Sequence, residues 1–197
     1  MAIKAVIFDL DGTITEPFLD FDAIRQEIGL TPEDATLLEA MEKMTPPQRK
    51  RAMDIIERHE AKAVEESTLN AGAKALLDKL REGGIKIGIL TRNKRSNAIA
   101  IAQKHSLAFD AIFDREDGPV KPDAFGVLWL CKKFHVRPTE ALVVGDYLYD
   151  VLAAKAAGAG AVLLKNHPQA DEFAKHADFA IAKLEEIHQI IDSKLND

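Results

Sequence analysis

Short apolar runs alternate along the chain with amphipathic segments of helix length, and this alternation restricts the possible folds more than any other feature. The runs are rich in β-branched residues and comprise residues 5–8, 85–90, 111–113, 141–144, 161–164 and 179–181. Segments 71–81 and 96–105, which lie between runs, are typical of amphipathic helices. Because buried strands that alternate with helices form mainly parallel sheets, the sequence predicts an α/β protein.

The interval between about residues 17 and 70 interrupts this alternation. No part of it is typical of a strand, whereas segments 35–43 and 48–66 carry apolar and charged residues at helical spacing. Residues Thr45-Pro46-Pro47 are the predicted break between these two helices. We therefore expect a small inserted α-helical domain at 17–70 and a core domain made of residues 1–16 and 71–197.

Composition and charge restrict the classes of function. The 197 residues are 47% hydrophobic and 29% charged, which is typical of a globular protein with a sizeable core. The formal net charge of −6 disfavours binding to nucleic acid or to an anionic membrane. A small phosphorylated anion remains a possible ligand, because local positive charge in a cleft can outweigh a weakly acidic surface.

The cysteine content and the N-terminal region indicate the compartment. Cys131 is the one cysteine of the chain and lies in an apolar stretch, so no intrachain disulfide can form and a reducing compartment is compatible. Near the N-terminus Lys4, Asp9 and Asp11 interrupt the apolar residues, and we expect neither a signal peptide nor a membrane span. These features predict a cytoplasmic location.

Two carboxylates follow the first predicted strand, in the sequence Asp9-Leu10-Asp11-Gly12-Thr13. The carboxyl ends of parallel strands form the edge at which α/β proteins bind ligands. An isolated Asp-x-Asp-Gly sequence is also typical of a turn. The motif therefore indicates a functional site only if residues after the other strands complete it.

Phosphate-binding candidates follow the second predicted strand and precede the fourth. Thr91, Arg92 and Asn93 bring a hydroxyl and consecutive backbone N–H groups to the same edge ahead of a helix, although Thr91 alone would also suit a helix N-cap. Lys121 precedes Pro122, which restricts the backbone and could begin the next helix. A lysine held there could neutralise both the carboxylates and a phosphate.

Asp146 and Asp150 follow the fourth predicted strand, so up to four acidic groups converge on one edge of the sheet. Such a cluster cannot stay ionised and dry without countercharge. Lys121 supplies one positive charge, and a hard divalent cation with oxygen ligands is also implied. Magnesium is the natural candidate for this cofactor.

In this order the motifs resemble those of the haloacid dehalogenase (HAD) superfamily, in particular phosphatases of the phosphoglycolate phosphatase-like branch with a helical cap. The resemblance covers nearly the whole chain and rests on Asp9-Leu10-Asp11-Gly12-Thr13, Thr91, Lys121 and Gly145-Asp146 with Asp150. It implies a Rossmann-like core, the HAD fold, with residues 17–70 as a cap that closes over the site. The expected function is hydrolysis of a phosphate monoester of a small metabolite, with phosphoglycolate as one candidate substrate.

The same resemblance implies roles for the catalytic residues. Asp9 would attack phosphorus and form an aspartyl phosphate, while Asp11 would act as general acid and base. Lys121 and Thr91 would contact the phosphate. The substrate-binding residues implied in this way are Thr91, Arg92, Asn93 and Lys121.

The resemblance also implies a magnesium site. Its ligands would be the side chains of Asp9 and Asp146 and the backbone carbonyl of Asp11, with Asp150 in support. These roles agree with the chemistry of phosphoryl transfer, which depends on positioning and on neutralisation of charge.

Two alternative functions share parts of this pattern. A phosphomutase of the same superfamily, similar to β-phosphoglucomutase, would carry all of these motifs and stays open. A receiver-type signalling domain also combines clustered aspartates, a threonine and a lysine on a parallel sheet. The leading Asp9 motif, the helical insertion and the late Asp146 and Asp150 favour the hydrolase. The motifs do not predict the oligomeric state.

Overall fold

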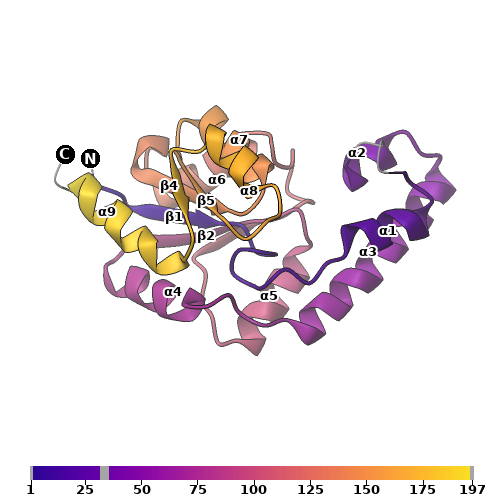
Figure 1. The fold of residues 1–197 in the computed structure, drawn as a ribbon, viewed down its shortest axis with the longest axis horizontal. Coiled ribbons are helices and arrows are strands. Elements are labelled where there is room, and N and C mark those ends of the chain that lie inside the picture. Colours follow the sequence, from indigo (N-terminus) through magenta and orange to yellow (C-terminus); the bar gives the residue numbers. More distant parts are fainter. Residues whose placement is uncertain (1, 32–35, 196–197) are drawn as a thin grey trace. The chain divides into compact units, whose positions relative to one another are not determined.

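The computed structural model describes residues 2–31 and 36–195, with side chains up to residue 193. The predicted core-domain ends at residues 1 and 197 and the predicted helix start at residue 35 lie outside the described residues. Within them, six parallel strands form one sheet in the order β3-β2-β1-β4-β5-β6 (Figure 1). The strands are β1 (Ala5–Phe8), β2 (Lys86–Leu90), β3 (Ala111–Phe113), β4 (Ala141–Gly145), β5 (Gly160–Leu164) and β6 (Phe179–Ile181). The predicted α/β class is confirmed, and the strands coincide closely with the six apolar runs.

Helices cover both faces of the sheet, which is why the central strands are apolar throughout. On one face α6 (Phe125–Phe134), α7 (Leu148–Ala157) and α8 (Ala170–Phe173) enclose the strand side chains Ile7 and Val143. The other face carries α4 (Ala73–Glu82), α5 (Arg95–Lys104) and α9 (Ile187–Leu195) (Figure 1). Short 3-10 helices lie at Pro138–Glu140, Ala174–His176 and Leu184–Glu186. The predicted helices 71–81 and 96–105 correspond to α4 and α5.

The chain divides into two compact units, one made of Met1–Pro17 and Thr68–Asp197 and the other of Phe18–Ser67. The smaller unit contains α1 (Phe21–Ile28), α2 (Leu37–Glu42) and α3 (Pro46–Glu66). It has its own apolar cluster of buried side chains, formed by Ile24, Met41, Ala52, Ile55 and Ile56. Such a cluster allows a small helical unit to hold its shape independently of the sheet.

The two segments that join the units run side by side. Thr15 and Leu69 form an antiparallel bridge, and the backbone N–H of Glu16 donates to the carbonyl of Thr68 at 3.0 Å. The chain therefore leaves the larger unit and returns to it at neighbouring points.

The predicted break in the insertion is placed differently by the structure. Pro46 and Pro47 do not separate two helices but form the first turn of α3. Thr45 precedes that turn, and its backbone N–H donates to Gln48 Oε1 at 3.0 Å. Proline is tolerated there because the first N–H groups of a helix have no intrahelical acceptor. The break lies instead at 43–45, so of the predicted residues only Thr45 belongs to it.

The expectation that Pro122 begins the next helix is wrong, because α6 begins at Phe125. Asp123 lies in the preceding turn, where its Oδ1 accepts a hydrogen bond from the N–H of Phe125 at 2.7 Å. Further along α6, Cys131 is buried, and burial raises the pKa of its thiol to about 11. A neutral thiol in an apolar environment agrees with the prediction that Cys131 is part of the core.

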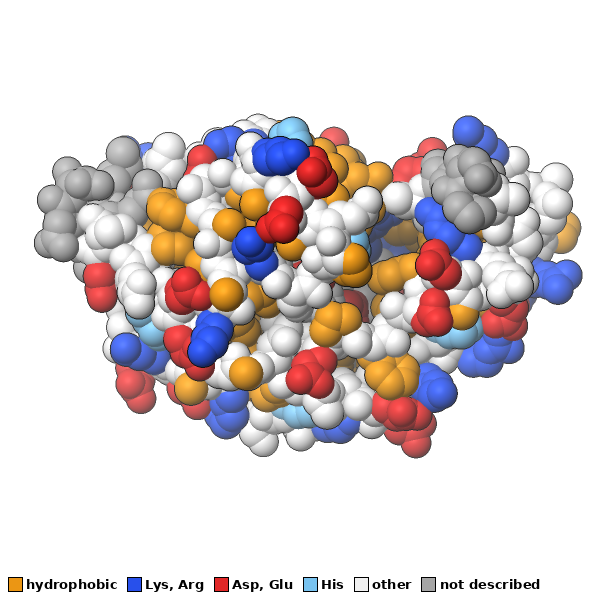
Figure 2. Space-filling model, viewed as in Figure 1, with side chains coloured by type: hydrophobic (Ala, Val, Ile, Leu, Met, Phe, Trp, Pro, Cys, Tyr) orange, Lys and Arg blue, Asp and Glu red, His pale blue; other side chains and the backbone are white. Residues whose placement is uncertain are grey.

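Two surface properties bear on possible partners. None of the helices within residues 2–31 and 36–195 is both long and apolar enough to span a bilayer. On the face seen in Figure 2, acidic and basic side chains are interspersed over the described residues, without an extended basic area. Nucleic-acid binding surfaces characteristically gather their positive charge on one face.

Candidate active site

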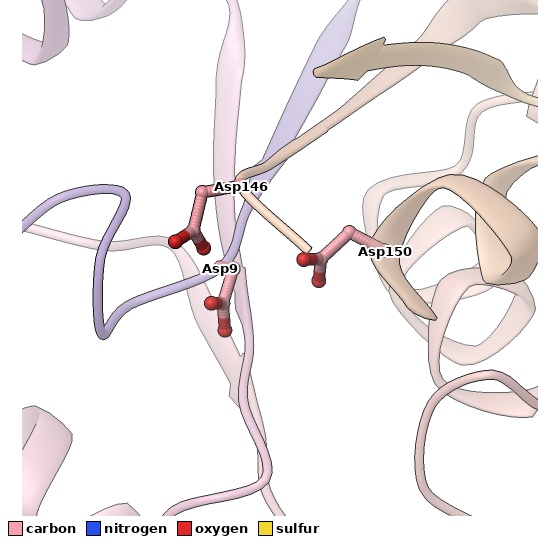
Figure 3. Close-up of side chains that lie close together, drawn as sticks. All are labelled: Asp9, Asp146 and Asp150. Carbon is pink, nitrogen blue, oxygen red and sulfur yellow. The ribbon is translucent and has the colours of Figure 1, made fainter. Parts of the chain in front are cut away.

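The carboxylates predicted from the first and fourth strands meet at the centre of the sheet. Phe8 of β1 pairs with Val144 of β4, and the N–H of Asp9 donates to the carbonyl of Val144 at 2.8 Å. Asp9 and Asp146 therefore leave the sheet from adjacent strands, at the point where the strand order reverses and ligands commonly bind. Asp150, in the first turn of α7, lies near both (Figure 3), and oxygens of the three carboxylates lie within 4.8 Å of one another.

Lys121 supplies the positive charge next to this cluster. Its Nζ donates to Asp9 Oδ1 and to Asp150 Oδ1, both at 2.6 Å. The lysine is only 4% exposed, and burial by itself would favour its neutral form. The nearby charges of Asp150 and Asp9 outweigh that effect and raise the pKa of the ammonium group. Lys121 is therefore a fixed cation that bridges two carboxylates.

One lysine does not neutralise three carboxylates, and the raised pKa values of Asp146 and Asp150 reflect this. Burial is the main cause that raises the pKa of Asp146, and the charges of Asp9 and Asp150 raise it further. Burial also raises the pKa of Asp150, although Lys121 opposes the shift. The described site thus carries more negative charge than its own groups can balance.

Two glycines allow the carboxylates to approach the backbone. Gly12 has a φ of +84°, and a Cβ built on it would lie 2.4 Å from Asp146 Oδ2. A Cβ on Gly145 would lie 2.1 Å from the carboxyl carbon of Asp150. Any larger residue at either position would push a carboxylate out of the cluster. Thr13 adds a hydroxyl that donates to Asp146 Oδ1 at 3.3 Å.

The segment after β2 contacts the second aspartate of the first motif. Thr91 is buried, and its Oγ1 accepts a hydrogen bond from the N–H of Asn93 at 3.0 Å. The side-chain amide of Asn93 donates to Asp11 Oδ2 at 3.1 Å. The Asn93 oxygen in turn accepts from Asn97 at 2.8 Å. Asp11 is therefore oriented from β2, whereas Asp9, Asp146 and Asp150 form the group of three carboxylates.

Arg92, a predicted substrate-binding residue, contacts Tyr149 and Arg115, which lie outside the carboxylate cluster. Its guanidinium group is 5.3 Å from the centre of the Tyr149 ring, a geometry suited to a cation–π interaction. Its backbone carbonyl accepts a hydrogen bond from Arg115 at 3.3 Å. Tyr149 also contacts the ring of Tyr147 edge-on, with ring centres 5.3 Å apart.

Two asparagines that the sequence did not single out hold the loop of the first motif. The amide of Asn70 lies 3.0 Å from the carbonyl of Gly12, and the amide of Asn166 donates to the same carbonyl. Neither residue belongs to a motif, and each becomes adjacent to Gly12 only when the sheet forms. No local sequence signal could have indicated them.

The residues present fit a hard divalent cation. Carboxylate oxygens are the ligands that such ions prefer, and the three aspartates offer them at short range, with Asp146 and Asp150 buried and Asp9 partly exposed. The excess of negative charge around Lys121 favours a second cation over an empty cluster. The sequence prediction of a metal-binding acidic cluster therefore agrees with the chemistry of the donor groups.

Comparison with known proteins shows to which protein family the chain belongs. A doubly wound sheet with carboxylates and a lysine at its carboxyl edge fits both a hydrolase of the phosphatase class and a receiver-type domain. A family model described as haloacid dehalogenase-like hydrolase matches residues 3–158, which include Asp9, Lys121 and Asp150. The chain belongs to the haloacid dehalogenase-like hydrolase family. This membership confirms the resemblance and favours the enzyme over the receiver-type alternative.

Individual relatives and one solved structure extend the match over nearly the whole chain. The chain is 33% identical to an uncharacterized hydrolase of Saccharomyces cerevisiae, over 96% of this chain and 90% of the yeast protein. It is 26% identical to a phosphoglycolate phosphatase of Chromobacterium violaceum, over 96% of each chain. The crystal structure of a hydrolase from Pseudomonas syringae superimposes with a TM-score of 0.81 at 22% identity, over 96% of this chain and 98% of that one.

Proposed function

We propose that the protein is a magnesium-dependent phosphatase that hydrolyses a phosphate monoester of a small metabolite through an aspartyl phosphate on Asp9. The observation that carries this proposal is the bridge from Lys121 to Asp9 and Asp150 beside Asp146. A lysine that holds Asp9 from one side can orient its carboxylate for in-line attack and partly neutralise an incoming phosphate.

In the first step Asp9 would attack phosphorus, and the bond from phosphorus to the ester oxygen would break. Asp11 would donate a proton to that leaving oxygen. In the second step water would attack the phosphorus of the aspartyl phosphate and lose a proton to Asp11. The bond from Asp9 to phosphorus would then break and release inorganic phosphate. The hydrogen bond from Asn93 supports the Asp11 role, because it fixes one oxygen of that carboxylate.

The remaining site residues would bind the phosphate and the cation. Asp9 and Asp146, with the carbonyl of Asp11, would hold magnesium, and Asp150 would keep Lys121 in place. When bound, magnesium supplies positive charge that stabilises the phosphoryl oxygens during transfer. The hydroxyl of Thr91 and the ammonium of Lys121 would contact the phosphate, together with Arg92 and Asn93 on the loop after β2.

The inserted helical unit would act as the cap that selects the substrate. Its separate apolar cluster and its paired connecting segments are compatible with a module that moves relative to the core. Phosphoglycolate is one candidate substrate, since a relative at 26% identity is named a phosphoglycolate phosphatase. A cytoplasmic location stays a prediction, supported by the single buried Cys131.

A screen for phosphate release tests the proposal. Purified protein would be incubated with a panel of phosphorylated metabolites, with magnesium or with EDTA, and Asp9→Asn would serve as the inactive control. We expect magnesium-dependent release of inorganic phosphate from at least one small ester. Conversion of a sugar phosphate into its isomer without phosphate release would support the phosphomutase instead. Turnover that is the same in EDTA, or in Asp9→Asn, would contradict the mechanism.

A further inference from the structure

The loop from Leu10 to Thr15 carries Asp11, and its backbone turns sharply. The N–H groups of Thr13, Ile14 and Thr15 all point to the carbonyl of Leu10, at 3.3, 3.0 and 3.0 Å. Gly12, at the start of this turn, packs directly against the carboxylate of Asp146. A small rotation of the peptide group at Gly12 would therefore shift Asp11 and disturb Asp146 together.

We propose that Asn166 and Asn70 are positioning residues that hold the Gly12 carbonyl and thereby fix Asp11 for catalysis. This inference rests on the proposed phosphatase function. Both side-chain amides donate to the one oxygen, Asn70 at 3.0 Å. A carbonyl oxygen with two lone pairs can accept both bonds, and together they restrict the peptide plane.

The orientation of Asn166 is fixed by chemistry. The carbonyl of Gly12 can only accept a hydrogen bond, so the nitrogen of the Asn166 amide must face it. The Oδ1 of Asn166 is then buried without a hydrogen-bond partner in the part of the chain that the structure describes. A buried orphan acceptor is costly for folding. The fold keeps the hydrogen bond to Gly12 although it leaves Oδ1 unpaired. This is expected if the bond serves catalysis rather than stability.

Asn70 contacts the same loop from the segment that follows the insertion. Its amide nitrogen lies 2.8 Å from the carbonyl of Thr13 and 3.0 Å from that of Thr15, in addition to the Gly12 contact. Its own N–H donates to the carbonyl of Ile14 at 3.0 Å. Asn70 thus fixes the loop at the point where the chain returns from the insertion.

Three asparagines orient Asp11 through different atoms, namely Asn93, Asn166 and Asn70. Asn93 contacts the carboxylate, whereas Asn166 and Asn70 contact the backbone one residue later. They come from the ends of β2 and β5 and from the segment that follows the insertion. Catalytic geometry must be held within a fraction of an ångström, and such supporting contacts achieve this.

The test uses Asn166→Leu, which keeps the branched shape of the side chain but removes both polar atoms. If Asn166 were only structural, loss of its hydrogen bond to Gly12 would lower the melting temperature, with no change in catalysis. As a positioning residue, its replacement should lower kcat/KM about 10- to 100-fold on the best alkyl phosphate of the panel, without a lower melting temperature. Gln169→Leu is the matched control, because it exchanges an exposed amide three residues further along.

The choice of substrate separates a misplaced Asp11 from a general loss of activity. Acetyl phosphate has a leaving group that needs little protonation, so its kcat/KM should fall much less than that of the alkyl phosphate. Equal losses on both substrates, or kcat/KM values within twofold of wild type, would overturn the positioning role.

Hydrogen exchange provides a readout that does not depend on activity. Amides in a peptide that covers residues 9–16 should exchange faster in Asn166→Leu than in wild type or Gln169→Leu. If wild type hydrolyses no ester but this peptide exchanges faster in the variant, the proposed function fails while the contact to the loop stands. Unchanged exchange would remove the structural basis of the inference.

Discussion

Lys121 donates from its Nζ to Asp9 Oδ1 at 2.6 Å, although 112 positions separate the two residues in the chain. The contact joins the loop before α6 to the end of β1. It places a buried cation against the carboxylate that we propose as nucleophile.

Lys121→Met should destabilise the protein and abolish most of its activity. It keeps most of the side-chain length but leaves buried carboxylates without their cation, which typically costs about 3–5 kcal/mol. We expect kcat/KM to fall at least about 100-fold. Denaturant unfolding and phosphate-release kinetics would measure both effects. In the control Lys155→Met, which breaks a surface pair with Asp178, stability should change by less than about 1 kcal/mol.

Magnesium should raise the melting temperature of the wild type, because binding to the folded state stabilises it by about 2.7 kcal/mol at a hundredfold excess over Kd. Asp146→Asn should lose this shift. In EDTA, however, the variant should be at least as stable as wild type, because it removes a buried carboxylate whose pKa is raised by burial and by Asp9 and Asp150. Thermal unfolding with and without magnesium checks both statements. A full magnesium shift in Asp146→Asn would exclude Asp146 as a ligand.

Asp9→Asn and Asp11→Asn should fail at different steps. Asp9→Asn cannot form the aspartyl phosphate and should be inactive on every substrate. Asp11→Asn should still be phosphorylated by acetyl phosphate, but hydrolysis of the intermediate should be slow because the general base is missing. Mass spectrometry after acid quench should find one added phosphoryl group on Asp11→Asn and none on Asp9→Asn. A label that maps to a peptide without Asp9 would contradict the assignment.

Replacing residues 18–67 by a short linker should leave a folded core. The deletion is geometrically simple, since Glu16 and Thr68 already share a backbone hydrogen bond of 3.0 Å. We expect hydrolysis of acetyl phosphate to persist and discrimination between metabolites to fall, because the insertion is proposed to select the substrate. Circular dichroism would verify folding, and ratios of kcat/KM across the panel would measure selectivity. Unchanged ratios would place selectivity in the core.

Glu140→Gln should lower the free energy of unfolding, relative to wild type, by more at pH 7 than at pH 3. Hydrogen bonds from Lys4 and then from Arg137 lower the pKa of Glu140 to about 2. The unfolded state therefore takes up the proton first as pH falls, so the stabilisation is complete above about 4.5 and is lost toward pH 2. Unfolding curves at the two pH values check this, with the exposed Glu82→Gln as control. A constant difference between wild type and Glu140→Gln would contradict it.

The periodicity of the sequence was sufficient to predict the sheet and its strands. Runs such as 5–8 and 141–144 coincide with β1 and β4 because buried strands must be apolar over their whole length. Helix ends were predicted less well. Pro122 suggested a helix start that lies at Phe125, and Pro46 belongs to a helix that was expected to begin later. Proline restricts the backbone of a turn and of a first helical turn alike, so local sequence does not distinguish them.

The motifs predicted which polar residues would gather, because parallel strands deliver their carboxyl ends to one edge. They did not predict which atoms would touch. The sequence grouped Asp9, Asp11, Asp146 and Asp150 at one edge of the sheet. In the described residues Asp9, Asp146 and Asp150 lie together, whereas the Asp11 side chain contacts Asn93. Side-chain direction after a strand depends on the turn that follows, and that turn is set by packing against Gly12 and Gly145.

The sequence by itself determined the sheet, the insertion after the first strand and the chemical types of residue at the site, since these follow from hydrophobic period and chain order. Only the tertiary structure decided the bridge of Lys121 to two carboxylates and the two asparagines on the carbonyl of Gly12. Asn166 and Gly12 are 154 positions apart, and an asparagine carries no pattern of its own. Its partner is decided by which backbone carbonyl the folded sheet brings within hydrogen-bond distance, because a side-chain amide acts over only about 3 Å.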